Sequence, residues 1–161
     1  MLRVAVLTIS DKGSRGERED VSGRVIREAI GSIGAQVVAY RIVPDEREAI
    51  AQAITGWADA EAVDIILTTG GTGLGPRDVT PDATRPILDR ELPGVAEAMR
   101  AESLKKTPRA MLSRAVAGTR RRAVIVNLPG SPSAVRECLD VVLTALPHAV
   151  EILQGRPTDH A

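Results

Sequence analysis

The sequence predicts an α/β protein, in which a mostly parallel sheet is covered by helices on both faces. The near-continuous apolar runs at 4–9 and 123–127 are typical of strands that are buried on both sides. Segments with apolar residues at helical spacing, such as 21–33, lie between these runs, so strands and helices alternate along the chain. With 161 residues, the chain is long enough for one domain, 1–161, with its own core. We therefore expect a single three-layer α/β/α domain.

The first half of the chain predicts three strands, each followed by a polar segment and a helix. The loop at 10–20 is long for a connection between a strand and a helix, and such loops are often functional. The helix after this loop is expected to end at Gly34. Asp45 can cap the next helix, with Glu48 as its capping-box partner. The strands are expected at 4–9, 36–43 and 62–69, and the helices at 21–33 and from the segment 44–48 onward.

The second half of the chain predicts several helices and one further strand. Thr80 is expected to cap a helix that has Pro81 in its first position and stops before Pro93. Pro147 should bend the last helix, because proline removes one helical hydrogen bond. The helices are expected at 80–92, 95–104, 109–117 and 134–153, the strand at 123–127, and a tail at 155–161.

Composition argues against several classes of function. Acidic and basic side chains balance at 21 each, which disfavours nucleic acid or a membrane as a partner held by charge. Trp57 and Tyr40 are the only large aromatic side chains, so stacking on single-stranded nucleic acid is not expected. Cys138 is expected to be an inert buried thiol, and His148 and His160 stand apart from the candidate site. We identify neither a leader nor a membrane-spanning run, and we expect a cytoplasmic protein.

A phosphate site is predicted by residues 68–84, which read TTGGTGLGPRDVTPDAT. A strand, four glycines, an acidic residue and a helix start follow one another directly. Glycines let backbone amides approach an anion closely, and the helix adds free N–H groups and the positive end of its dipole. The segment is not a P-loop, and Pro76 occupies the place of the third glycine of a dinucleotide fingerprint. A merely structural glycine-rich turn is the alternative.

Polar side chains follow each predicted strand, and the carboxyl ends of parallel strands meet at one edge of the sheet. Carboxylates beside a phosphate repel it, by about 4 kcal/mol for unit charges about 4 Å apart at an effective dielectric constant near 20. Asp45 and Asp78 would therefore need a cation between them and the phosphate, and Mg²⁺ suits this role. Alternatively, Asp45 only caps a helix and Asp78 only binds the amides of its own loop. The candidate crevice residues include Ser10, Asp11, Thr72, Asp82 and Ser131.

The predicted crevice contains no histidine, which disfavours a nucleophile activated by histidine. A nucleoside triphosphate site with Mg²⁺ suits transfer of a phosphorus group to an acceptor that is already anionic, because such an acceptor needs no general base. The residues identify neither the acceptor nor the phosphorus atom that is attacked.

Four segments together resemble the molybdopterin adenylyltransferases, the Mog-type proteins of molybdenum cofactor synthesis. They are SDKGSRGEREDVSG at 10–23, the glycine-rich 68–84, LSRAVAG at 112–118 and NLPGSPSAV at 127–135. The resemblance covers nearly the whole chain. It implies the α/β fold of that family, a homotrimer, and a reaction in which ATP and molybdopterin give adenylylated molybdopterin and pyrophosphate, with Mg²⁺ as the cofactor.

The resemblance also implies roles for individual residues. Asp45 and Asp78 fall on the two functional aspartates of the family, as catalytic residues and metal ligands. Glu97 would lie near the pterin, although it could also be a solvent-facing helix residue. The residues implied to bind substrates are Ser10, Asp11, Gly70, Gly71, Thr72, Gly73, Gly75, Asp82, Glu97, Ser113, Gly130 and Ser131. The alternatives are a non-catalytic molybdopterin-binding trimer that acts as carrier or scaffold, and a sister-branch protein of tungsten or molybdenum cofactor synthesis.

Overall fold

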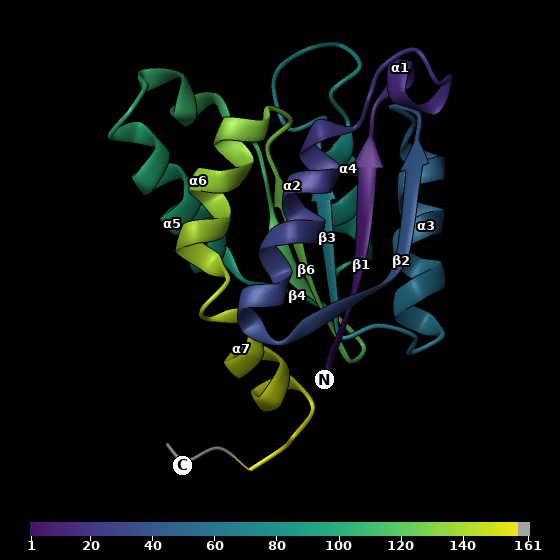
Figure 1. Ribbon diagram of the computed structural model, residues 1–161, viewed down its shortest axis with the longest axis vertical. Coiled ribbons are helices and arrows are strands. Elements are labelled where there is room, and N and C mark those ends of the chain that lie inside the picture. Colours follow the sequence, from purple (N-terminus) through teal and green to yellow (C-terminus); the bar gives the residue numbers. More distant parts are fainter. Residues whose placement is uncertain (158–161) are drawn as a thin grey trace.

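The computed structural model describes residues 1–157. At its centre is a six-stranded sheet with the strand order β2-β1-β3-β6-β5-β4 (Figure 1). The first four strands in that order are parallel, and β5 and β4 extend the sheet as an antiparallel edge. The expected mostly parallel sheet is thus confirmed. The strands are β1 (Leu2–Ile9), β2 (Ala35–Val43), β3 (Ile65–Thr69), β4 (Arg90–Glu91), β5 (Ala117–Arg120) and β6 (Ala123–Leu128).

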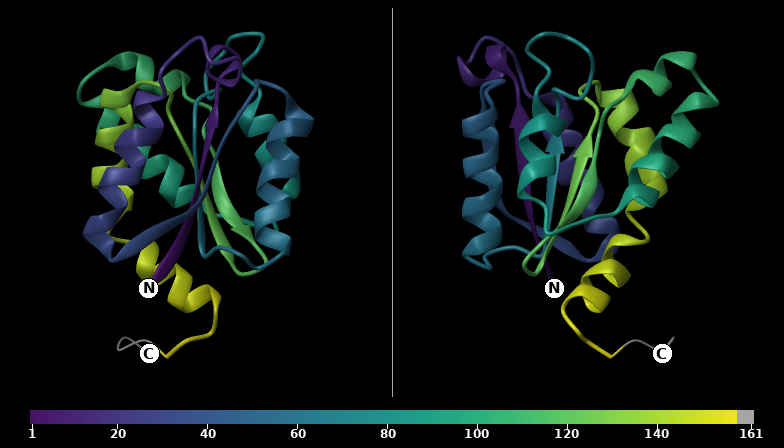
Figure 2. Two further views of the ribbon diagram at one scale, coloured as in Figure 1. Left: turned by 45° about the vertical axis from the view of Figure 1, so that its right-hand side comes forward. Right: turned by 180° about the vertical axis from the view of Figure 1, so that it is seen from behind.

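Helices cover both faces of the sheet, as two views of the molecule show (Figure 2). Alternate side chains of β1 enter different cores, with Val4 and Val6 packing in one layer and Ala5 and Leu7 in the other. This alternation explains why the strand is apolar throughout. The α-helices are α1 (Asp11–Ser14), α2 (Val21–Ala29), α3 (Arg47–Asp59), α4 (Thr80–Thr84), α5 (Pro93–Leu104), α6 (Pro132–Val142) and α7 (Leu146–Leu153), and 3-10 helices span Ile30–Ile33, Arg85–Ile87 and Pro108–Leu112.

Two of the expected helices are wrong. The expected helix at 80–92 ends as α4 at Thr84, and the chain continues through a 3-10 turn into β4. The expected helix at 109–117 is a 3-10 helix, and β5 follows it. The small residues of β5 pair with β6 through a tight hairpin in which Arg121 has φ 50°. Pairing with a buried strand thus outweighs a weak local preference for helix.

Several boundaries also differ from expectation. Glu46, not Asp45, is the N-cap of α3, because the Asp45 carboxylate accepts a hydrogen bond from the Asp11 amide instead. Val79 is the N-cap of α4, while the hydroxyl of Thr80 donates to the Gly70 carbonyl. The last helix is interrupted before Pro147, which divides it into α6 and α7.

The predicted edge of the sheet carries the polar segments. The carboxyl ends of β1, β2, β3 and β6 lie together, beside α1 and the glycine-rich loop, and α7 and the N-terminus lie at the other end of the sheet (Figure 1). Gly34 ends the first helical segment as predicted, with φ 67°. Residues 158–161 of the predicted tail, with His160, lie outside the described residues. Within residues 1–157, no helix is long and apolar enough to cross a membrane.

Candidate functional site

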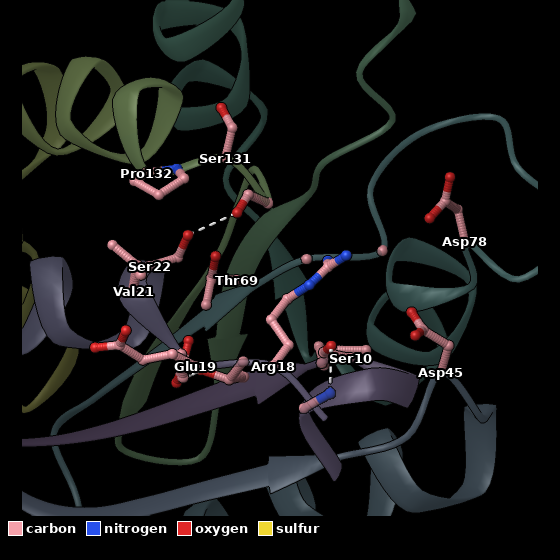
Figure 3. A pocket seen from close by; sticks show the side chains of 17 residues that line it. Ser10, Arg18, Glu19, Val21, Ser22, Asp45, Thr69, Asp78, Ser131 and Pro132 are labelled. Atoms are coloured by element: carbon pink, nitrogen blue, oxygen red, sulfur yellow. Dashed lines mark hydrogen bonds between the residues drawn. The ribbon is translucent and has the colours of Figure 1, made fainter. Parts of the chain in front are cut away.

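A cavity of about 600 Å³ lies at the carboxyl ends of the parallel strands (Figure 3). Its walls come from the segments after β1, β2, β3 and β6. The predicted residues Ser10, Asp45, Gly70, Gly71, Asp78, Gly130 and Ser131 all line it. The structure therefore brings together residues that are as much as 121 positions apart in the sequence, from Ser10 to Ser131.

The glycine-rich loop, residues 70–78, approaches its surroundings too closely for larger side chains at its first positions. Gly70 and Gly71 have φ values of 102° and 69°, which L-residues with side chains rarely adopt. A Cβ atom on Gly71 would collide with the hydroxyl of Thr80 and lie 3.3 Å from Asp45 Oδ1. The amide of Thr80 donates to the Gly71 carbonyl over 3.0 Å. The loop is therefore held against the start of α4 and against Asp45.

The two candidate acids lie on the same side of the cavity (Figure 3). Asp78 Oδ2 accepts a hydrogen bond from the Gly75 amide at 2.8 Å, so the alternative of a bond to its own loop also holds. Burial raises the pKa of Asp45, and the charges of Asp11 and Asp78 raise this pKa further, against the effect of the hydrogen bond from the Asp11 amide. A cation between Asp45 and Asp78 would relieve this repulsion.

Asp11 fastens the first loop to the second and third strand ends. Its amide donates to Asp45 Oδ2 over 2.9 Å, and the Asp45 amide donates to Asp11 Oδ1 over 3.0 Å. The guanidinium of Arg77 donates to both oxygens of the same carboxylate. These bonds from Arg77 and from the Asp45 amide lower the pKa of Asp11. Asp11 thus holds Asp45 and Arg77 in place, although it does not itself line the cavity.

Hydroxyl groups organise other parts of the cavity wall. Ser131 caps α6 by accepting hydrogen bonds from the Ala134 amide on its hydroxyl and from the Val135 amide on its carbonyl, so the positive end of the α6 dipole begins at the cavity. Ser22 donates to the Gly130 carbonyl over 2.6 Å, and this bond joins α2 to the turn before α6. Ser10 caps the short α1 through the Gly13 amide. These contacts fix the loops whose backbone faces the cavity.

A second cavity of about 280 Å³ lies next to the first, between α5, α6 and the 3-10 helix at Pro108–Leu112. The predicted residues Thr72, Gly73 and Ser113 line this cavity instead of the first. Gly71 and Thr72 are consecutive but line different cavities, and the same is true of Pro129 and Gly130. At both positions, neighbouring residues of the chain thus line different cavities.

Four predicted residues line neither of these two cavities, and they are Asp11, whose contacts are given above, Gly75, Asp82 and Glu97. Glu97 lies on the exposed side of α5, which agrees with the alternative of a solvent-facing helix residue. Asp82 binds the guanidinium of Arg114 at 3.1 Å, and this bond lowers the pKa of Asp82. Gly75 donates to Asp78, as described above. Cys138 is buried as predicted and lines the second cavity, and burial raises the pKa of its thiol.

Sequence reasoning missed several residues of the site. Arg18 extends across the first cavity (Figure 3), but nothing in the charged loop at 10–20 distinguishes it from its neighbours. Thr69 was counted only as part of a strand, although a hydroxyl at a strand end can be a signal for a site. Arg114 was overlooked because its partners lie 32 to 41 positions away in the sequence.

The donor set fits a hard divalent cation. Within residues 1–157, no cluster of three or more His, Cys, Asp or Glu side chains is arranged to hold a metal ion. Mg²⁺ commonly takes one or two carboxylates and completes its shell with water and substrate phosphates. Asp45 and Asp78 supply such a pair beside loop amides and a helix N-terminus, where phosphates are favoured. The arrangement suits the binding of an anionic, metal-associated substrate.

Comparisons with known proteins agree with this geometry. Residues 5–148 match the family model described as a probable molybdopterin binding domain. The chain is 42% identical over 156 residues to the molybdopterin adenylyltransferase of Helicobacter pylori strain J99, and the match covers 96% of this chain and 89% of that protein. It is 46% identical over 149 residues to the molybdenum cofactor synthesis protein cinnamon of Drosophila melanogaster, covering 92% of this chain and 25% of that protein.

Solved structures give the same result. The crystal structure of the molybdopterin biosynthesis enzyme MoaB from Thermus thermophilus is 55% identical in sequence, with a TM-score of 0.91. The match covers 98% of this chain and 99% of that one. Sequence and fold thus point to the same group of proteins.

Proposed function

The chain belongs to the family of probable molybdopterin binding domains, and we propose that it is a molybdopterin adenylyltransferase. In this reaction AMP is transferred from ATP to molybdopterin, and pyrophosphate is released. The observation that carries the proposal is the placement of Asp45 and Asp78 at one side of a cavity that Gly70 and Gly71 of the glycine-rich loop also line. The 42% identity of this chain to a molybdopterin adenylyltransferase also supports an enzyme over a non-catalytic carrier.

The first cavity is proposed to hold ATP. The glycine-rich loop and the positive end of the α6 dipole would attract the phosphates, and the Arg18 side chain, which extends across this cavity, adds a positive charge. Asp45 and Asp78 would hold Mg²⁺, which would supply positive charge beside the phosphates when bound. The chain's own contribution is to fix the two carboxylates and to orient the α-phosphate toward the acceptor.

The second cavity is proposed to hold the pterin. Its walls combine apolar side chains, such as Ala96 and Met99, with the polar groups of Ser113 and Glu137. This mixture is typical of sites for flat heterocycles. Because the consecutive residues Gly71 and Thr72 line different cavities, the terminal phosphate of molybdopterin would reach the nucleotide near this peptide. Because that phosphate is already anionic at neutral pH, no side chain has to remove a proton from it.

The test is release of pyrophosphate from ATP, with the product identified by mass. We expect product only when molybdopterin and Mg²⁺ are both present. Asp78→Asn should lower turnover by about 100-fold or more, as removal of one preorganised charged group does in other enzymes. The matched control is Asp59→Asn, because Asp59 pairs with Arg120 and Arg121 far from both cavities. A carrier would bind molybdopterin but release no pyrophosphate, and that result would reject the proposed activity.

We further propose a homotrimer that acts in the cytoplasm, where ATP is made and used. The exposed apolar residues Leu104, Met111 and Leu112 support self-association, because they lie close together on α5 and the following 3-10 helix. Light scattering during size-exclusion chromatography measures the assembly directly, and a monomer mass would reject the trimer. Fractionation of the host cells tests the location.

A further inference from the structure

Arg114 lies between the 3-10 helix at Pro108–Leu112 and β5, and its side chain reaches into the glycine-rich loop. Its Nε atom donates to the Gly73 carbonyl at 2.8 Å, and its Nη2 atom donates to the Asp78 carbonyl at 2.6 Å. These two carbonyls stand at the two ends of the exposed tip of the loop, residues 74–77. One guanidinium therefore joins the start of the tip to its end.

Arg114 is itself held in one orientation. Its amide donates to the Thr72 carbonyl over 2.9 Å, which fixes the backbone beside the loop. Asp82, one turn beyond Asp78, accepts hydrogen bonds from both terminal nitrogens at 3.1 to 3.2 Å. The planar fork of arginine suits this set of partners, because its donors point in fixed directions. The Asp82 carboxylate thus orients the guanidinium toward the loop.

Other contacts fix the tip less firmly. The Asp78 amide donates to the Gly75 carbonyl, and the Gly75 amide donates to the Asp78 side chain, but these bonds lie within the tip and do not tie it to the rest of the domain. The bidentate ion pair of Arg77 with Asp11 ties the tip to the first loop, but solvent weakens this pair because the Arg77 side chain is 59% exposed. Leu74 is 66% exposed, so the tip has little apolar burial to hold it in place.

We infer that Arg114 is a positioning residue that sets where the Asp78 carboxylate lies relative to Asp45. This inference rests on the proposed function, in which both acids hold the metal. Arg114 is not among the residues that line the first cavity, so it acts through the loop backbone rather than on the substrate. Asp82, which sequence reasoning placed at the substrate, serves the same purpose by orienting Arg114.

The experiment measures how much Mg²⁺ strengthens the binding of an ATP analogue with a non-hydrolysable link between the α- and β-phosphates. Titration calorimetry with and without Mg²⁺ gives this enhancement without turnover. We expect Arg114→Met to lose about tenfold or more of the enhancement, because even a small displacement of the Asp78 carboxylate from the metal position is costly. Binding without Mg²⁺ should change by about twofold at most. Arg114→Lys keeps the positive charge but not the planar fork of donors. Its enhancement by Mg²⁺ should lie between those of the unmodified chain and of Arg114→Met.

The matched control is Arg120→Met. Arg120 also binds both oxygens of an aspartate, Asp59, and donates to the Ile87 carbonyl at 2.8 Å, but it lies on β5 outside both cavities. The control should lose stability, read from the thermal unfolding midpoint, and keep the full enhancement by Mg²⁺. This comparison separates a specific effect on the metal ligand from a general loss of stability.

The outcomes separate this inference from the proposed function. If the unmodified chain shows no enhancement by Mg²⁺, the metal role of the two acids is wrong, and the inference falls with it. If Asp78→Asn loses the enhancement while folded Arg114→Met and Arg114→Lys both keep it, only the inference is rejected. Loss in both Arg114 variants, with both folded by circular dichroism and the Arg120 control unaffected, supports it.

Discussion

Replacement of Gly71 by alanine tests whether the glycine-rich loop is shaped by close contact. Gly71 has a left-handed φ, which costs a residue with a side chain about 1–2 kcal/mol. The new methyl group would also displace the hydroxyl of Thr80, a fully buried group that donates to the Gly70 carbonyl over 2.8 Å. Loss of a buried hydrogen bond costs about 1–3 kcal/mol more. We expect Gly71→Ala to destabilise the fold by about 2–5 kcal/mol in total.

Gly34→Ala is the matched control for this variant. Gly34 has nearly the same φ, 67°, but a Cβ atom there would meet no atom within 4 Å. The difference between the two variants in the free energy of unfolding therefore reports the close contacts of position 71 with Thr80 and Asp45. Urea denaturation followed by circular dichroism gives both values. Equal losses in the two variants would refute the idea that close packing requires glycine at position 71.

Three further predictions follow from other parts of the chain. Burial raises the pKa of Asp64, but hydrogen bonds from Arg3 outweigh this effect and lower the pKa to about 2. About 2 kcal/mol of stability should therefore be lost as the pH falls from about 4 to about 2, because the carboxylate is protonated more readily in the unfolded chain. Acid denaturation of Asp64→Asn should lack this component, and an unchanged acid profile would contradict it. Burial and the bond to Asp20 raise the pKa of Tyr40 to about 12, and because Tyr40 is the only tyrosine, absorbance near 295 nm should report this ionisation directly. A midpoint near pH 10 in the folded chain would contradict the contact. Finally, Arg18→Met should raise the KM for ATP by about tenfold with a smaller change in kcat, and an unchanged KM would place Arg18 outside the ATP site.

Much of the fold follows from local patterns in the sequence. The apolar run of β1 indicates a strand buried on both faces, and its residues do alternate between two cores. The convergence of Asp45, Gly71 and Ser131 was predictable, because the carboxyl ends of parallel strands share one edge. The end of a strand can be recognised from the local sequence. The parallel arrangement of the strands then brings these ends together.

What the sequence did not reveal depends on contacts between distant segments. The strand β5 exists because it pairs with β6, and its own residues are too few and too small to indicate it. Asp45 matches the pattern of a helix cap, yet the Asp11 amide, 34 positions away, takes its carboxylate. The division of the site into two cavities likewise depends on where α5 and α6 pack. No local pattern carries such information.

The placement of the N-terminus and of α7 bears on how this domain can be combined with others. Both the N-terminus and α7 lie at the end of the sheet remote from the two cavities (Figure 1). An additional domain attached before β1 or after α7 would begin at the end of the sheet away from both cavities. In the Drosophila relative the matching stretch makes up 25% of a longer polypeptide. A domain that is connected to other domains through segments remote from its cavities can be combined with them without changes to the residues that line those cavities.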